Sequence, residues 1–218
     1  MDIAIIGTGN VGRALATSLT RAGHHVTLAA RDAAKARAVA EELGTDVAPT
    51  ASEAVAAAEA TIIAVPFSAA ADVAEEIGSA AAGKVVIDAT NPLNADYTGL
   101  ATEPGTSAAE ELAAELPEAH VVKAFNPLFA SVQADPARPG VTVDGLYATD
   151  DPVAAETVAE LIESIGLRPV NAGGLARARE LEALAFLNIQ LQLRNGGSWD
   201  TAVTLVAPPA KATEAKAA

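Results

Sequence analysis

MDIAIIGTGNVG, residues 1–12, opens the chain with a short apolar run followed by three glycines. Residues 3–6 read as a buried β-strand, and the Ala- and Leu-rich segment after Gly12 reads as a helix. A G-x-G-x-x-G pattern between a strand and a helix is typical of dinucleotide binding, although the same pattern also occurs in ordinary strand–helix turns. Gly7 would make the tight turn, Gly9 would let the backbone approach a pyrophosphate, and Gly12 would let the helix pack closely on the strand. The phosphates are expected at the free N–H groups of the helix start.

The composition limits the kinds of partner. The 218 residues carry a formal net charge of −14, and 50% of them are hydrophobic. A surface of this charge repels phosphate backbones, so neither nucleic acid nor an anionic membrane is expected as a partner. The acidic excess fits either a salt-rich cell interior or a simple need for solubility.

Several kinds of site are excluded by residue type. The chain has no cysteine, which excludes disulfides, thiolate catalysis and Cys-ligated metals. Its three histidines, His24, His25 and His120, lack the spacing of a metal site, so no metal is expected. No apolar run reaches the ~18–20 residues of a membrane helix, and no signal peptide precedes the first strand. We therefore expect a cytoplasmic protein.

Strands and helices alternate over residues 1–172, which predicts an α/β fold with a Rossmann-type, doubly wound parallel sheet. The order of the first six strands is expected to be 3-2-1-4-5-6. Strands are expected at residues 3–6, 25–30, 46–48, 60–65, 85–89, 120–125, 143–148 and 167–170. Helices are expected at residues 11–22 and 33–43, from Ser52, at 106–116 behind a capping box, and from Asp151-Pro152. Residues 92–104 and 131–141 follow carboxyl ends of strands and read as functional loops, with variable surface loops as the alternative.

The character of the chain changes after Gly173-Gly174. Residues 177–194 read as one long helix with apolar residues on more than one face, and such a helix is normally buried. On a domain of this size a second subunit would cover it, so a homodimer is expected. The predicted organisation is a nucleotide-binding domain (1–172), a C-terminal helical appendage for the acceptor site and the dimer contact (173–206), and a disordered tail (207–218). Within the appendage, residues 199–206 read as a final strand or an extended arm.

The end of the second strand indicates which nicotinamide cofactor is preferred. NAD sites place an acidic residue about 20 residues past the glycines, where it accepts hydrogen bonds from the ribose. Here the segment reads Ala29-Ala30-Arg31-Asp32, with Lys35 and Arg37 following. The planar guanidinium of Arg31 can stack on adenine and donate two hydrogen bonds to a 2′-phosphate, and Lys35 can add a second positive charge. This pattern favours NADP, while Asp32 leaves NAD open.

With these features in view, the chain resembles the NADPH-dependent deazaflavin reductases, also called F420H2:NADP oxidoreductases, over nearly its whole length. The motifs that carry the resemblance are Gly7-Thr-Gly-Asn-Val-Gly12, Ala30-Arg31, Val65-Pro66, Val121-Val-Lys-Ala-Phe-Asn126, Gly166-Leu-Arg-Pro-Val-x-Ala-Gly173, and Leu181-Glu-x-Leu184 leading to Leu187-Asn-Ile189. The same dinucleotide-binding group includes the cytosolic domains of membrane ferric reductases.

The resemblance implies hydride transfer between NADP(H) and coenzyme F420, a small-molecule redox acceptor stacked on the nicotinamide. Stacked rings exchange hydride directly, so no catalytic acid–base residue is expected. The family's cofactor contacts map onto the pyrophosphate turn (Thr8, Gly9, Asn10, Val11), the 2′-phosphate (Ala30, Arg31, Lys35), the ribose wall (Val65, Pro66, Phe67) and the ring pocket (Asn126, Leu128, Ala130), with Asn91 as a further contact.

The chain also departs from the family pattern. Ala30 and Asp32 stand where the family often has a serine and a second basic residue, and Asn126 stands where deazaflavin enzymes have a histidine. Only Lys123 and Arg138 are near enough in the expected fold to anchor the anionic tail of the acceptor. Two other functions stay open: a reductase of free flavin or another small acceptor, and a module that senses NADP(H) without turnover.

Overall fold

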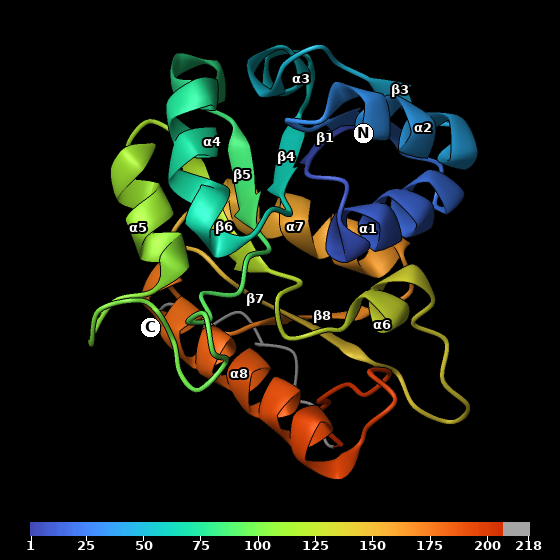
Figure 1. The fold of residues 1–218 in the computed structure, drawn as a ribbon, viewed down its shortest axis with the longest axis vertical. Coiled ribbons are helices and arrows are strands. Elements are labelled where there is room, and N and C mark those ends of the chain that lie inside the picture. Colours follow the sequence, from blue (N-terminus) through green and yellow to red (C-terminus); the bar gives the residue numbers. More distant parts are fainter. Residues whose placement is uncertain (207–218) are drawn as a thin grey trace, which may run out of the picture.

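A computed structural model of the chain describes residues 1–206 and confirms the expected α/β architecture, with helices on both faces of an eight-stranded sheet (Figure 1). The strands are β1 (Asp2–Ile6), β2 (His25–Ala29), β3 (Asp46–Val47), β4 (Ala60–Ile63), β5 (Val85–Asp88), β6 (His120–Ala124), β7 (Asp144–Ala148) and β8 (Arg168–Asn171). The α-helices are α1 (Asn10–Arg21), α2 (Ala33–Leu43), α3 (Ala51–Ala57), α4 (Ala70–Ile77), α5 (Ala108–Glu115), α6 (Ala130–Ala134), α7 (Pro152–Ser164) and α8 (Ala178–Asn195). Short 3₁₀ helices are η1 (Phe67–Ala69), η2 (Gly78–Ala81) and η3 (Leu175–Arg177).

Strand β1 shows how the sheet separates two hydrophobic cores. Successive side chains of a strand point to opposite faces. Ile3 and Ile5 accordingly pack in one core with α1, α2 and α7, whereas Ala4 and Ile6 pack in the other with α3, α4 and α5. All four side chains are buried, as expected for a central parallel strand covered on both faces.

The strand order is β3-β2-β1-β4-β5-β6-β7-β8, which confirms the predicted order of the first six strands. The expectation that the whole sheet is parallel was wrong at β7, which pairs antiparallel with β6, while β8 is parallel to β7. A parallel neighbour needs a long crossover, usually a helix that packs across the sheet. The link from β6 to β7 contains only the short α6, which packs against α1, so the chain returns in the opposite direction.

One local expectation needs correction, and one open alternative is decided. Residues 131–141 do not form one long loop, because α6 occupies the first part of this segment. Residues 199–206 form an extended arm and not a strand. Hydrogen bonds from Arg168 Nη2 to the Leu205 carbonyl (2.8 Å) and from Thr204 Oγ1 to the Thr142 carbonyl (3.0 Å) hold this arm against the β7–β8 side. The predicted disordered tail, 207–218, lies outside the described residues.

Helix α8 presents an unusual distribution of side chains. It lies beside the loop that follows β5 (orange to red in Figure 1), and Gln190 Nε2 donates to the Tyr97 carbonyl of that loop at 2.6 Å. Its buried positions include the polar residues Glu182, Asn188 and Gln192, whereas Leu187 is 54% exposed. The inner face of α8 is therefore partly polar and its outer face partly apolar. No helix within residues 1–206 is both long enough and apolar enough to span a membrane.

Candidate functional site

A cleft lies at the carboxyl ends of β1 and β4, the point from which the chain builds the sheet outward in both directions. Ligands of open α/β sheets bind at this switch point. The cavity there has a volume of about 560 Å³. Eight residues expected from the sequence line it, namely Gly7, Thr8, Gly9, Ala30, Arg31, Lys35, Val65 and Pro66.

Each glycine of the first turn has a distinct environment. Gly7 has φ = 116°, and a Cβ there would lie 2.4 Å from the Ala64 carbonyl oxygen. A Cβ on Gly12 would lie 2.0 Å from the Gly7 carbonyl oxygen, so this glycine permits the close packing of α1 on the turn. A Cβ on Gly9 would meet nothing within 4 Å. Gly9 thus faces open space in the cleft, as a residue that lets a pyrophosphate approach must.

The start of α1 leaves backbone donors for an anion. Gly9 is the N-cap residue and has no side chain to accept from the first turn. The first N–H groups of a helix lack partners within the helix, and they lie at the positive end of its dipole. Asn10, Val11 and Gly12 supply these groups at the mouth of the cleft. An anionic pyrophosphate fits the turn on both space and charge.

A basic pair borders the far end of the cleft. Arg31 and Lys35 are exposed, and neither side chain forms an ion pair within residues 1–206. The neighbouring Asp32 is the N-cap of α2, and its Oδ1 accepts from the Lys35 backbone N–H at 3.0 Å. One oxygen of this carboxylate is therefore engaged in capping α2. The two cations suit a phosphate at this position.

The cavity also includes residues that the sequence did not indicate. They come from the β3–α3 connection, the first residue of α3, the end of η1, and α4: Pro49, Thr50, Ala51, Ala69, Asp72, Val73 and Glu76. Glu76 Oε1 accepts from the Ala51 N–H at 2.7 Å and so ties α4 to the start of α3. The only local signal was the cap sequence Thr50-x-x-Glu53, which marks a helix start and by itself points to no ligand.

The remaining expected residues do not line this cavity. Asn91 follows β5, while Asn126, Leu128 and Ala130 follow β6, so they lie farther along the same edge of the sheet. Phe67 lies in η1, directly after Pro66. Asn126 is 3% exposed and Leu128 is 5% exposed, so both side chains are buried.

A pair of amides joins the ends of β5 and β6. Asn126 Nδ2 donates to Asn91 Oδ1 at 3.2 Å, and Asn91 Nδ2 donates to the Asn126 carbonyl at 3.1 Å. Asn126 Nδ2 also lies 3.2 Å from the Leu181 carbonyl of α8, so this pair contacts the appendage. Within the described chain, Asn126 Oδ1 is buried and accepts no hydrogen bond. A buried acceptor without a partner is uncommon and suits a site that receives a donor from a ligand.

The turn that carries Asn126 has an unusual backbone. Phe125 has φ = 66°, a value that costs energy for a residue with a bulky side chain. Gln133 is fully buried, and its Nε2 donates to the carbonyls of Phe125 (2.9 Å) and Leu128 (2.8 Å). Gln133 therefore braces the strained turn, a role that its sequence position did not indicate.

Three charged side chains are buried beneath the amide pair. Lys123 Nζ lies 2.8 Å from Asp88 Oδ2 and 2.9 Å from Glu182 Oε1, and it also donates to the Thr90 carbonyl at 2.8 Å. Burial raises the pKa of Glu182, and the nearby ammonium of Lys123 opposes that effect. The expectation that Lys123 anchors an acceptor tail was wrong, because its side chain is fully buried and paired. Arg138, the other candidate anchor, pairs with Asp200.

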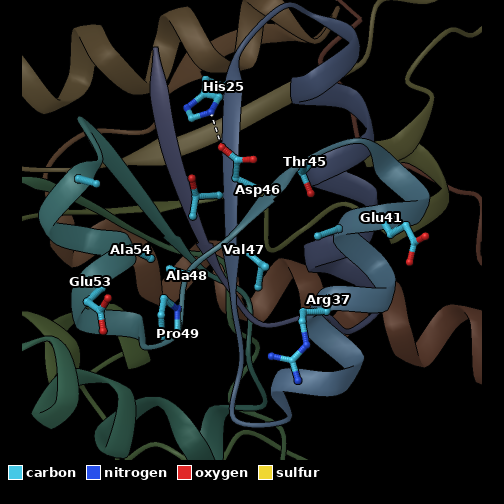
Figure 2. Close-up of a pocket in the computed structure, with 13 residues that line it drawn as sticks. His25, Arg37, Glu41, Thr45, Asp46, Val47, Ala48, Pro49, Glu53 and Ala54 are labelled. Atoms are coloured by element: carbon cyan, nitrogen blue, oxygen red, sulfur yellow. Dashed lines mark hydrogen bonds and ion pairs between the residues drawn. The ribbon is translucent and has the colours of Figure 1, made fainter.

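A second cavity, of about 620 Å³, lies along the edge strand β3 (Figure 2). His25 begins β2 and contacts Asp2 Oδ1 and Asp46 Oδ2, each at 2.9 Å. Hydrogen bonds to Asp46 and then to Asp2 raise the pKa of His25. These side chains are exposed and lie away from the glycine turn. No group of three potential metal-ligating side chains occurs within residues 1–206.

The sequence and the fold are similar to those of known reductases. A family model described as "NADP oxidoreductase coenzyme F420-dependent" matches residues 2–92. The F420-dependent NADP reductase of Methanothermobacter marburgensis is 36% identical over 212 residues, covering 89% of this chain and 94% of the relative.

Two other similarities extend the comparison. A crystal structure from Arthrobacter sp., provisionally described as an F420-dependent NADP reductase, has a TM-score of 0.83 at 29% identity, covering 94% of this chain and 100% of that one. Metalloreductase STEAP3 of Rattus norvegicus is 32% identical over 186 residues, which are 84% of this chain and 36% of that protein. From the identity and coverage of the archaeal reductase, this chain belongs to the family of F420-dependent NADP reductases.

Proposed function

We propose that this protein transfers hydride between NADP(H) and a deazaflavin of the F420 type. The observation that carries the proposal is the cleft itself. It has an open glycine turn at one end and, at the other, two cations, Arg31 and Lys35, that form no ion pair within residues 1–206. The archaeal relatives are named for this activity. NADP(H) supplies the hydride chemistry, and the residues of this chain bind and orient the two reactants.

Each part of the cleft has a proposed role. The turn around Gly9 and the start of α1 hold the pyrophosphate, and Arg31 with Lys35 holds the 2′-phosphate. Val65, Pro66 and Phe67 wall the ribose. The nicotinamide end extends toward the ring-pocket residues Asn91, Asn126, Leu128 and Ala130. Direct hydride transfer depends on the orientation of the two rings, which fits a site built from backbone and amide groups.

Residues 173–206 are proposed to complete the acceptor site and to form the contact of a homodimer. Support comes from the Leu181 carbonyl, which meets Asn126 Nδ2, and from the exposed leucines of α8. A cytoplasmic location is part of the same proposal, since the reaction draws on the NADPH pool.

Anaerobic NADPH oxidation tests the activity. Purified protein receives deazaflavin, FMN or no acceptor in parallel, each at low and at high salt, because the net charge of −14 makes salt a relevant variable. Rapid oxidation with deazaflavin and little with FMN is the expected result. NADPH binding without oxidation by either acceptor would contradict the proposal and favour a sensing role.

A free flavin is the second candidate acceptor. Asn126 occupies the position at which deazaflavin enzymes have a histidine, and the chain is 32% identical to a rat protein named a metalloreductase. Faster oxidation with FMN than with deazaflavin in the same assay would select this candidate.

A further inference from the structure

The buried ion cluster of Lys123, Asp88 and Glu182 lies directly beside the amide pair of Asn91 and Asn126. Asp88 is three residues before Asn91 on the β5 side, Lys123 is three residues before Asn126 on the β6 side, and Glu182 follows Leu181 on α8. The Leu181 carbonyl contacts Asn126 Nδ2, so the same three elements supply both groups. The charged group forms the lower layer and the amides form the upper layer, nearer the carboxyl edge of the sheet.

The two layers are joined through the backbone of Thr90. Lys123 Nζ donates to the Thr90 carbonyl at 2.8 Å, and Asp88 Oδ1 accepts from the Thr90 N–H at 2.8 Å. The backbone N–H and the backbone carbonyl of Thr90 are therefore both fixed by the ion cluster, one residue before Asn91. Glu182 Oε2 accepts from the Ala108 N–H at 3.1 Å, which adds the start of α5 to the same assembly.

From this arrangement we propose that Lys123 is a positioning residue, which fixes the Asn91–Asn126 amide pair at the nicotinamide end of the cleft. The inference rests on the proposed function for the location of the nicotinamide. Lys123 would not touch either reactant, because it is fully buried among Asp88, Thr90 and Glu182.

Fold stability alone is a poor reason for such a cluster. Taking three charges out of water is costly, and well-packed apolar residues often stabilise a core as well or better. Ionic hydrogen bonds have a directional geometry that apolar contacts lack. The Lys123 ammonium donates hydrogen bonds to Asp88 Oδ2 and to the Thr90 carbonyl, each at 2.8 Å, and it forms an ion pair with Glu182 Oε1 at 2.9 Å. It thereby links the ends of β5 and β6 to α8 in one arrangement.

The test compares two ligands that differ only at the nicotinamide end: NADPH and 2′-phospho-ADP-ribose, which lacks the nicotinamide. Lys123→Met keeps most of the side-chain volume and removes the donor to Thr90. The variant is expected to bind 2′-phospho-ADP-ribose within about twofold of the wild type, and to bind NADPH about ten- to a hundredfold more weakly. A changed fluorescence emission of bound NADPH is the second expected readout, because it reports the surroundings of the reduced ring.

Arg179→Met is the matched control. Arg179 Nε donates to Glu110 Oε2 at 2.8 Å, so this variant also removes an ion pair between α8 and α5, but one that does not touch Thr90. It is expected to leave the ratio of the two affinities unchanged. If Lys123→Met fails to fold, Lys123→Met combined with Glu182→Gln removes one of the two uncompensated carboxylates and is tested in the same way.

Three results would overturn the inference: equal weakening of both ligands, no change in either ligand, or the same selective loss in Arg179→Met. None of these measurements needs an acceptor. A wild-type protein that binds NADPH without reducing deazaflavin would therefore contradict the proposed function and still leave the role of Lys123 measurable.

Discussion

Arg31 is the residue on which the cofactor preference depends. Its guanidinium is exposed beside the cleft, and the carboxylate of Asp32 next to it is engaged as the cap of α2. Removing the guanidinium should remove a charge-assisted hydrogen bond to the 2′-phosphate of NADPH, a group that NADH lacks. Arg31→Ala is expected to weaken NADPH about ten- to a hundredfold and NADH less than about twofold. Fluorescence titration with both nucleotides measures the two dissociation constants.

Arg37→Ala provides the control for Arg31. Arg37 lies on α2, six residues after Arg31, but lines the second cavity, along β3 (Figure 2), so its loss should change neither affinity. Equal losses of NADPH and NADH in Arg31→Ala would mean that this residue does not hold the 2′-phosphate.

Gly9 offers a test of the open turn. Its backbone (φ −75°, ψ −170°) is available to any residue, and a Cβ would meet nothing within 4 Å. Gly9→Val should therefore fold, at a cost of at most about 1 kcal/mol for the changed N-cap, while its side chain fills the space needed by the pyrophosphate. We expect a nearly unchanged melting temperature and loss of NADPH binding by calorimetry. Gly7→Val should instead unfold, because φ is 116° and the Ala64 carbonyl oxygen is 2.4 Å away. Retained NADPH affinity in Gly9→Val would show that the turn has only a structural role.

Local sequence explains some of these residues and not others. The glycine turn could be predicted because its spacing encodes its own geometry within six residues. Lys123 could not, since its partners Asp88 and Glu182 are 35 and 59 positions away along the chain. Gln133 was missed for a similar reason: its role depends on the positive φ of Phe125, which no pattern in the sequence marks.

At the scale of single elements, helix caps connect local sequence to stability. Ser107 Oγ accepts from the Glu110 N–H (3.2 Å), as the predicted capping box of α5 requires, and it donates to Glu110 Oε2 (2.7 Å), so the Glu110 side chain meets the Ser107 hydroxyl. Thr50 caps α3 in a similar way but is exposed. Ser107→Ala is expected to lower the free energy of unfolding by about 1.5 kcal/mol, and Thr50→Ala by about 0.5 kcal/mol. Urea unfolding measures both changes in the free energy of unfolding. Equal losses in the two variants would contradict the idea that a buried cap contributes more than an exposed one.

The elements themselves were predicted better than their directions. Helix α2 begins and ends where its sequence predicts, at Ala33 and Leu43, because an Asp cap precedes it and Gly44 adopts a left-handed conformation after it. The direction of β7 was missed because alternating strand and helix signals are the same for parallel and antiparallel neighbours. The direction of β7 depends on the shortness of α6, a helix that the sequence analysis assigned to a loop.

At the scale of the whole molecule, no segment within residues 1–206 covers the outer face of α8. Leu187 and Leu191 are 54% and 47% exposed and lie one turn apart on this helix. Glu182 and Gln192 face inward instead and are held by partners in the core and the arm. The sequence indicated that α8 has more apolar surface than one domain can cover, but it could not indicate which face would remain outside.

A second copy of the chain would bury that face on both protomers at once, since a twofold interface uses the same patch twice. Burying a leucine is worth about 1.5–3 kcal/mol, so each of these side chains contributes twice to the assembly. Leu187→Glu is therefore expected to convert a dimer into a monomer in light scattering coupled to size exclusion. Val153→Glu is the matched control, because Val153 is 66% exposed and lies on a different helix, α7. A wild-type protein that is monomeric at the same concentrations would contradict the dimer. A Leu187→Glu variant that stays dimeric would place the dimer interface on another surface.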